Sequence, residues 1–132
     1  NKTISSNNII DTNKKILLVE DNELNYEIAK TVLEEAGFIV DGASNGKEVV
    51  DKASDNTYDV ILMDIQMPIM DGYEATKELR RLGNRTPIIA MTANAFSEDR
   101  KKAKDVGMDG YIPKPIDVNK LVSTIMNILN DQ

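Results

Sequence analysis

The chain has 132 residues, a length that suits one domain and leaves little room for a second. Its 16 basic and 22 acidic residues give a net charge of −6, which argues against a surface that binds nucleic acid or anionic membranes. Because the sequence holds neither Cys nor His, it excludes disulfides, thiol catalysis, Ser-His-Asp triads and metal sites built from those residues. We therefore expect any bound metal to be a hard cation held by oxygen atoms.

The first residues differ in composition from the rest of the chain. Residues 1–13 are rich in Asn, Ser and Thr and lack periodicity, which predicts a linker or disordered arm before a domain over 14–132. The chain begins with Asn1 rather than Met, so we expect a piece cut from a longer protein. The aliphatic runs are too short to span a bilayer, and we expect a cytoplasmic domain without direct membrane contact.

Five short apolar runs predict β-strands. The runs that begin at Lys15, Tyr58 and Pro87 are apolar at consecutive positions, as expected for central parallel strands covered on both faces. The predicted strands are Lys15–Val19, Phe38–Gly42, Tyr58–Met63, Pro87–Met91 and Gly110–Ile112.

The segments that follow these strands carry apolar residues at helical spacing, often between a polar N-cap and a glycine. In the first segment, Leu24, Ile28, Val32 and Ala36 recur every four residues and predict the buried stripe of a helix. The later helices are predicted from Val49, Val50 and Ala53 after an Asn45–Glu48 capping box, from Ala75, Leu79 and Leu82 after Asp71–Glu74, from Ser97 to Gly107, and from Val118, Leu121, Val122, Ile125 and Leu129 after Asp117.

The alternation of five strands and five helices predicts an α/β fold. We expect a five-stranded, doubly wound parallel sheet with helices on both faces, which is a flavodoxin-like (βα)5 three-layer sandwich. In such sheets, ligands bind beyond the carboxyl ends of the strands, where the strand order reverses. The residues that end the strands are therefore the candidates for a functional site.

Polar side chains follow four of the predicted strands: Glu20 and Asp21, Asp64, Thr92 and Lys114. Two carboxylates 4 Å apart repel by about 4 kcal/mol at an effective dielectric constant of 20, so three in one pocket favour a bound cation. Mg²⁺ suits such a site. The remaining hydroxyl and ammonium groups then suit an anion with several oxygen atoms, most simply a phosphoryl group.

Four stretches carry motifs of a known family. They are ILLVEDNELN at 16–25, VILMDIQMPIMDGYEAT at 60–76, TPIIAMTANAF at 86–96 and GYIPKPI at 110–116. In this order they resemble the receiver domains of bacterial two-component response regulators, over about residues 15–130. They are most similar to the receivers of hybrid sensor histidine kinases.

The resemblance implies a role for each polar residue at the strand ends. Asp64 matches the phosphoacceptor, and Lys114 matches the lysine that pairs with the phosphoryl group. The implied cofactor is Mg²⁺, with Mn²⁺ possible, and the implied ligands are Asp21, Glu20, Asp64 and the backbone carbonyl of Gln66.

The resemblance also implies a conformational switch. Thr92 matches the switch hydroxyl, Tyr111 matches the aromatic side chain that moves inward, and the Lys114–Pro115 peptide matches a bond that is cis in the family. We expect the switch to reshape a face built from the fourth helix, the fifth strand and the fifth helix.

The predicted helix that begins at Ser97 differs from the others in its thin apolar stripe, chiefly Ala103 and Val106. Weak packing suits an element that moves. The same helix carries a basic run, interpreted as a solvated face with a docking patch as the alternative: Arg100, Lys101, Lys102 and Lys104.

The implied partner is a phosphohistidine donor, either a histidine kinase or a histidine phosphotransfer domain, because the chain has no His of its own. We expect no nucleic-acid partner, and a monomer or a dimer through the switch face. The chain is then a phosphoacceptor that promotes its own phosphorylation and dephosphorylation rather than an enzyme acting on other substrates.

Four alternatives stay open at this point. The first is a stand-alone single-domain regulator. The second is a pseudo-receiver that only binds partners, although such a domain is expected to lack one or more site residues and all of them are present here. A haloacid-dehalogenase-like phosphatase needs a second Asp where Gln66 stands. A flavodoxin-like cofactor binder needs a phosphate-binding loop where the carboxylates of Glu20 and Asp21 would repel phosphate.

Overall fold

The structure, a computed structural model, describes residues 14–67, 69–93, 97–114 and 117–130, so the predicted arm at 1–13 lies outside the described residues. Strands and helices alternate along the described chain, as predicted. They are β1 (Lys15–Val19), α1 (Glu23–Glu35), β2 (Ile39–Ala43), α2 (Gly46–Asp55), β3 (Val60–Asp64), α3 (Gly72–Arg81), β4 (Ile88–Thr92), α4 (Ser97–Val106), β5 (Gly110–Pro113) and α5 (Val118–Asn130).

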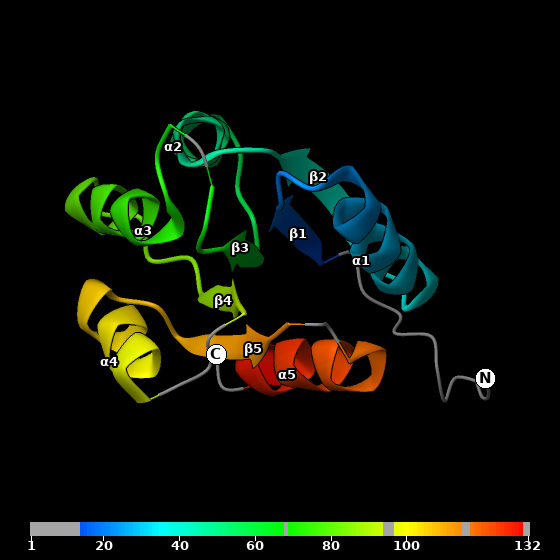
Figure 1. Cartoon of the computed structure of the whole chain (residues 1–132). Helices are drawn as coiled ribbons and strands as arrows, with labels where there is room; N and C mark the ends of the chain where they lie inside the picture. The colour runs from blue at the N-terminus through cyan, green and yellow to red at the C-terminus, as the bar shows by residue number, and fades with distance from the viewer. Residues whose placement is uncertain (1–13, 68, 94–96, 115–116, 131–132) are drawn as a thin grey trace.

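The strands form one parallel sheet in the order β2-β1-β3-β4-β5. Helices α1 and α5 cover one face, and α2, α3 and α4 cover the other (Figure 1). The order reverses between β1 and β3, so the crevice expected for ligands lies at the carboxyl ends of these two strands. This arrangement confirms the predicted doubly wound fold. No helix among the described residues is long and apolar enough to cross a lipid bilayer.

The central strands are buried on both faces, as the consecutive apolar residues predicted. Every residue of β3 and β4 is buried, whereas Ile39 on the edge strand β2 is half exposed. The predicted strand ends differ from the observed ones by one or two residues. Tyr58 precedes β3 and packs in the core, and Asp64 is the last residue of β3 rather than the first after it.

Side-chain caps fix where the helices begin. At α3 the predicted capping box is present, because Asp71 accepts from the Glu74 N–H at 2.9 Å and Glu74 accepts from the Asp71 N–H at 3.1 Å. At α2 only half of the predicted box forms. Asn45 accepts from the Glu48 N–H, but the Glu48 carboxylate turns to the N–H and hydroxyl of Ser44.

The predicted buried stripe of α1 is wrong at its first two positions. Leu24 and Ile28 are 70% and 47% exposed, whereas Ala29 and Leu33 are buried. The reason is geometric, since each step of four residues advances 40° beyond a full turn. The side chains of Leu24 and Ala36 therefore point about 120° apart.

The stripes of the other helices follow the predictions more closely. Leu79 of α3 is buried, but Leu82 is half exposed because it caps the helix beyond its last turn. In α5, Leu121 and Ile125 are buried, and Asp117 caps the helix by accepting from the Asn119 N–H at 2.9 Å.

The corrected stripe of α1 predicts unequal effects of two leucine substitutions. Leu33→Ala is expected to lower the free energy of unfolding by about 3 kcal/mol, because it leaves a cavity in the core. Leu24→Ala is expected to change it by less than about 0.5 kcal/mol. Urea unfolding followed by circular dichroism measures both, and equal losses would contradict this packing.

Candidate functional site

Three carboxylates meet at the carboxyl ends of β1 and β3. Glu20 and Asp21 directly follow β1, and Asp64 ends β3, its neighbour in the sheet. One oxygen atom from each of the three lies within 4.8 Å of the others. Glu20 and Asp64 are buried, whereas Asp21 is exposed at the rim. The sheet thus assembles the acidic cluster predicted from the strand ends.

Lys114 reaches this cluster from the end of β5. Its Nζ lies 3.0 Å from Oε1 of Glu20 and 3.1 Å from Oδ2 of Asp64. The backbone N–H of Lys114 donates to the carbonyl of Thr92 at 2.8 Å, which ties the lysine to the end of β4. One ammonium group therefore contacts both buried carboxylates.

Burial and charge shift the protonation equilibria in opposite directions at this site. Burial raises the pKa of Glu20, and Asp64 raises it further, although Lys114 and the Asn22 N–H partly offset the effect. Burial disfavours the charged form of Lys114, but its contacts with the two carboxylates outweigh this and raise its pKa. The cluster thus lacks positive charge, even with the lysine in place.

The residues present fit a hard divalent cation. The buried Oε1 of Glu20 has Lys114 Nζ as its charged partner at 3.0 Å. The donor set consists of carboxylate oxygens, which Mg²⁺ and Mn²⁺ prefer. Gln66, a further predicted ligand, donates its backbone N–H to Oδ1 of Asp64 at 3.2 Å, and its carbonyl stays a predicted ligand.

Thr92 and Tyr111, the two predicted switch residues, lie on the neighbouring strands β4 and β5. Asp64 pairs with Met91, so Thr92 is one residue further along the same edge of the sheet, and it is buried. Tyr111 is half-buried on β5. Pro115 lies outside the described residues, and with it the predicted cis peptide.

The contacts of the basic run on α4 are what the sequence interpretation missed. Arg100 donates from Nη1 to the Tyr111 hydroxyl at 2.6 Å, and its guanidinium lies 5.2 Å from the ring centre. Lys102 lies 4.5 Å from the centre of the Tyr73 ring on α3. Two of the four cations thus contact aromatic rings. No sequence pattern links these pairs, because each joins separate elements.

Comparison with known families identifies the chain. A family model for the response regulator receiver domain matches residues 16–126. The chain belongs to this family. It is 41% identical over 131 residues to probable histidine kinase 2 of Oryza sativa subsp. indica, and this match covers 86% of the chain and 12% of the kinase. It is 39% identical over 124 residues to the polar-differentiation response regulator DivK of Brucella anthropi, which covers 89% of the chain and 98% of DivK.

Solved receiver structures share the fold. The receiver of sensor histidine kinase PA1611 from Pseudomonas aeruginosa, with a magnesium ion in its active-site cleft, has a TM-score of 0.83 and 38% identity. The match covers 90% of this chain and 99% of that one. The receiver of Ssk1 from Saccharomyces cerevisiae, in a co-crystal with the histidine phosphotransfer protein Ypd1, has a TM-score of 0.82 and 28% identity. That match covers 86% of this chain and 87% of the other. The chain spans 16% of the length of histidine kinase 5 of Arabidopsis thaliana.

The acidic cluster predicts that a divalent cation stabilises the receiver. Adding MgCl₂ is expected to raise the midpoint of thermal unfolding by a few degrees, because the ion binds only the folded cluster. Asp21→Asn is expected to remove most of this shift. The matched control is Asp51→Asn on α2, an exposed acidic residue paired with Lys47. A shift that survives Asp21→Asn would place the ion elsewhere.

Proposed function

We propose that this receiver domain of a two-component phosphorelay accepts a phosphoryl group on Asp64 from the phosphohistidine of a partner. One observation carries the assignment to Asp64: its buried carboxylate touches Lys114 through Oδ2 while lying within the acidic cluster. A buried carboxylate flanked by an ammonium group and by candidate metal ligands suits attack on phosphorus.

The proposed transfer needs no general base, because the nucleophile is already a carboxylate. An oxygen of Asp64 attacks phosphorus in line, the O–P bond forms, and the P–N bond to the donor histidine breaks. The electron pair of that bond stays on the imidazole nitrogen of the donor. The Gln66 N–H and the Lys114 Nζ hold the two oxygens of Asp64 and orient the carboxylate. The divalent cation supplies positive charge to the phosphoryl oxygens.

Hydrolysis resets the proposed switch. A water molecule attacks the same phosphorus, inorganic phosphate leaves and the Asp64 carboxylate is regenerated. The domain thus promotes its own phosphorylation and dephosphorylation and acts on no other substrate. Between these steps the added phosphoryl charge attracts the Thr92 hydroxyl, and Tyr111 moves into the space that Thr92 leaves.

We propose Mg²⁺ as the cofactor, with Mn²⁺ as the alternative. Its proposed ligands are Asp21, Glu20, Asp64 and the backbone carbonyl of Gln66. The exposed carboxylate of Asp21, and the short distances between its oxygen atoms and those of Glu20 and Asp64, support this set. The magnesium reported in the PA1611 receiver supports the choice of metal.

The phosphohistidine donor is proposed to dock on α1. This helix begins two residues after Asp21 and exposes the side chains of Leu24 and Ile28 one turn apart. An open cavity of about 750 Å³ adjoins it, lined in part by Glu20, Asp21 and Tyr26. The co-crystal of Ypd1 with the Ssk1 receiver supports a phosphotransfer domain as one kind of donor. A histidine kinase is the other.

We propose that the domain, over residues 14–132 with a linker at 1–13, comes from a hybrid histidine kinase. The similarity to plant and Dictyostelium kinases supports this origin. The similarity to DivK over 98% of its length supports a stand-alone regulator as the alternative. We further propose a cytoplasmic location and a monomer or a dimer through the α4-β5-α5 face.

The first test is labelling by a small phosphodonor. Incubation with acetyl phosphate and Mg²⁺ is expected to add one phosphoryl group, seen as a single adduct by intact mass spectrometry. Chelation of the metal and Asp64→Asn should each abolish the adduct, and Lys114→Ala should reduce it strongly. Normal labelling of Asp64→Asn would refute the proposed acceptor.

A second test separates docking from chemistry. Ile28→Asp on α1 is expected to slow transfer from a phosphohistidine donor by about tenfold, because a charge enters the apolar contact. Labelling by acetyl phosphate should not change, since that donor needs no docking helix. The control is Ile39→Asp, an exposed isoleucine on the edge strand β2. Equal effects of the two substitutions would remove α1 as the docking surface.

A further inference from the structure

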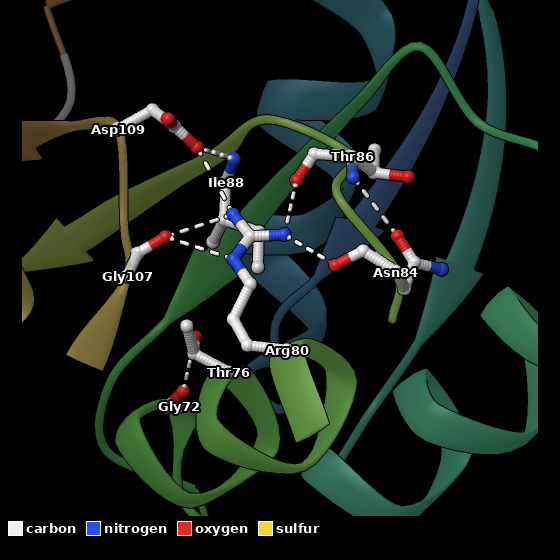
Figure 2. Close-up of polar contacts among 8 residues, drawn as sticks. All are labelled: Gly72, Thr76, Arg80, Asn84, Thr86, Ile88, Gly107 and Asp109. Carbon is white, nitrogen blue, oxygen red and sulfur yellow. Dashed lines mark hydrogen bonds and ion pairs between the residues drawn. The ribbon is translucent and has the colours of Figure 1, made fainter. Parts of the chain in front are cut away.

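Arg80, on the last turn of α3, donates hydrogen bonds to several backbone carbonyls (Figure 2). Its partners lie near the starts of β4 and β5, whereas the acidic cluster lies at the carboxyl ends of the strands. Its Nε and Nη2 donate to the carbonyl of Gly107 at 3.0 and 2.8 Å, and its Nη1 donates to the carbonyls of Asn84 and Thr86, both at 2.9 Å. Nη2 also donates to Asp109 Oδ2 at 3.1 Å. The side chain is only 14% exposed.

These contacts hold the C-terminal end of α4. Gly107 follows the helix with a φ of +106°, and the next N–H, that of Met108, returns to the carbonyl of Ala103 at 2.9 Å. A cation beside the last carbonyls of a helix is favourable because of the helix dipole. A Cβ at Gly107 would lie 3.1 Å from Cγ of Arg80, so the arginine chain packs directly against this turn.

The same guanidinium ties α4 to the sheet through Asp109. Oδ2 of Asp109 accepts from Arg80 and also from the N–H of Ile88, at 2.9 Å, where β4 begins. The N–H of Asp109 in turn donates to the carbonyl of Ile88 at 2.7 Å. Arg80 therefore joins α3, the end of α4 and the starts of β4 and β5 in one network.

The other half of α4 is held differently. Ala103 is the buried side chain of its described part, and the contacts nearer its start come from Arg100 on Tyr111 and from Lys102 on Tyr73. Cation–ring contacts at such exposed positions are weak, whereas Arg80 donates five hydrogen bonds from a side chain that is only 14% exposed.

Both rings belong to segments that lead back to the acidic cluster. Tyr111 is the predicted switch residue of β5. Tyr73 follows Gly72, whose N–H donates to the carbonyl of Ile65 at 2.9 Å, directly after Asp64. A change at Asp64 thus has a short route to the partners of Arg100 and Lys102, whereas the Arg80 network lies at the opposite ends of α3, β4 and β5.

We propose that Arg80 is a positioning residue that fixes the C-terminal end of α4 as a pivot, so that phosphorylation of Asp64 frees only the half of α4 held by Arg100 and Lys102. The asymmetric motion rests on the proposed function, whereas the clamp at Gly107 rests on the contacts of Arg80 alone. The end of α4 that moves is then the one nearer the acidic cluster.

Amide hydrogen exchange followed by NMR tests both parts. In the wild-type chain with Mg²⁺, phosphorylation by acetyl phosphate is expected to speed exchange at residues 101–104 by roughly tenfold and to leave the Met108 N–H unchanged. Arg80→Lys keeps the positive charge but loses the planar guanidinium group with its several N–H donors. In this variant the Met108 N–H should exchange roughly tenfold faster even without phosphorylation. Phosphorylation should then speed exchange along the whole of α4.

The control is Arg81→Lys, because Arg81 is exposed and pairs with Glu78 on its own helix. Core amides of β3 report any global loss of stability, which would speed exchange there as well. Unchanged protection of Met108 in Arg80→Lys would overturn the clamp. Faster exchange at Met108 in the phosphorylated wild type would overturn the pivot. Absence of a phosphoryl adduct would instead count against the proposed function, and the unphosphorylated comparison would still decide the clamp.

Discussion

The contact of one ammonium group with two buried carboxylates is the constraint on which the rest of the structure depends. Glu20 and Asp64 end adjacent strands, and their like charges repel strongly in a buried setting. Lys114 offsets part of this repulsion, yet burial, with a smaller contribution from Asp64, keeps the pKa of Glu20 raised. The site is therefore set up to gain positive charge. A divalent cation held by Glu20, Asp21 and Asp64 would supply this charge, and together with Lys114 it would favour an incoming phosphoryl group.

The parallel sheet makes this arrangement possible. Strands β1 and β3 deliver their carboxylates to the same edge, and β4 and β5 deliver Thr92 and Lys114 beside them. Hydrophobic layers cover both faces of the sheet, and every residue of β3 and β4 is buried. The polar groups of the candidate site thus lie at the ends of strands of one sheet.

Arg80 and Lys114 show two uses of a partly buried cation in the same fold. Lys114 contacts Glu20 and Asp64, the proposed phosphoacceptor, so phosphorylation of Asp64 would change its surroundings. Arg80 faces mainly backbone carbonyls, whose partial charges stay constant through that cycle. The first arrangement suits a group that responds to signalling, and the second suits a group that holds an element in place. Helix α4 contacts both α3 and β5, and Ala103 is the buried residue among its described side chains.

Periodicity correctly predicted the strands that are buried on both faces. It was less reliable in predicting which face of a helix packs against the sheet. The consecutive apolar residues of β3 and β4 identified central strands, because only burial on both faces tolerates such runs. The four-residue spacing from Leu24 misassigned the buried stripe of α1, since a spacing of four drifts around the helix. The capping box at Asn45 was half wrong because the Glu48 carboxylate found the N–H of Ser44 nearby.

The sequence by itself determined the doubly wound fold and the polar residues that end its strands, because alternating periodicity and strand-end position are local properties of the chain. It excluded His and Cys chemistry for the same reason. Only the tertiary structure decided which groups touch: Lys114 on two carboxylates, Arg100 on Tyr111, and Arg80 on Gly107. These contacts join residues on separate elements, and their geometry depends on how helices pack on the sheet. No local pattern in the sequence gives the distances between side chains on these separate elements.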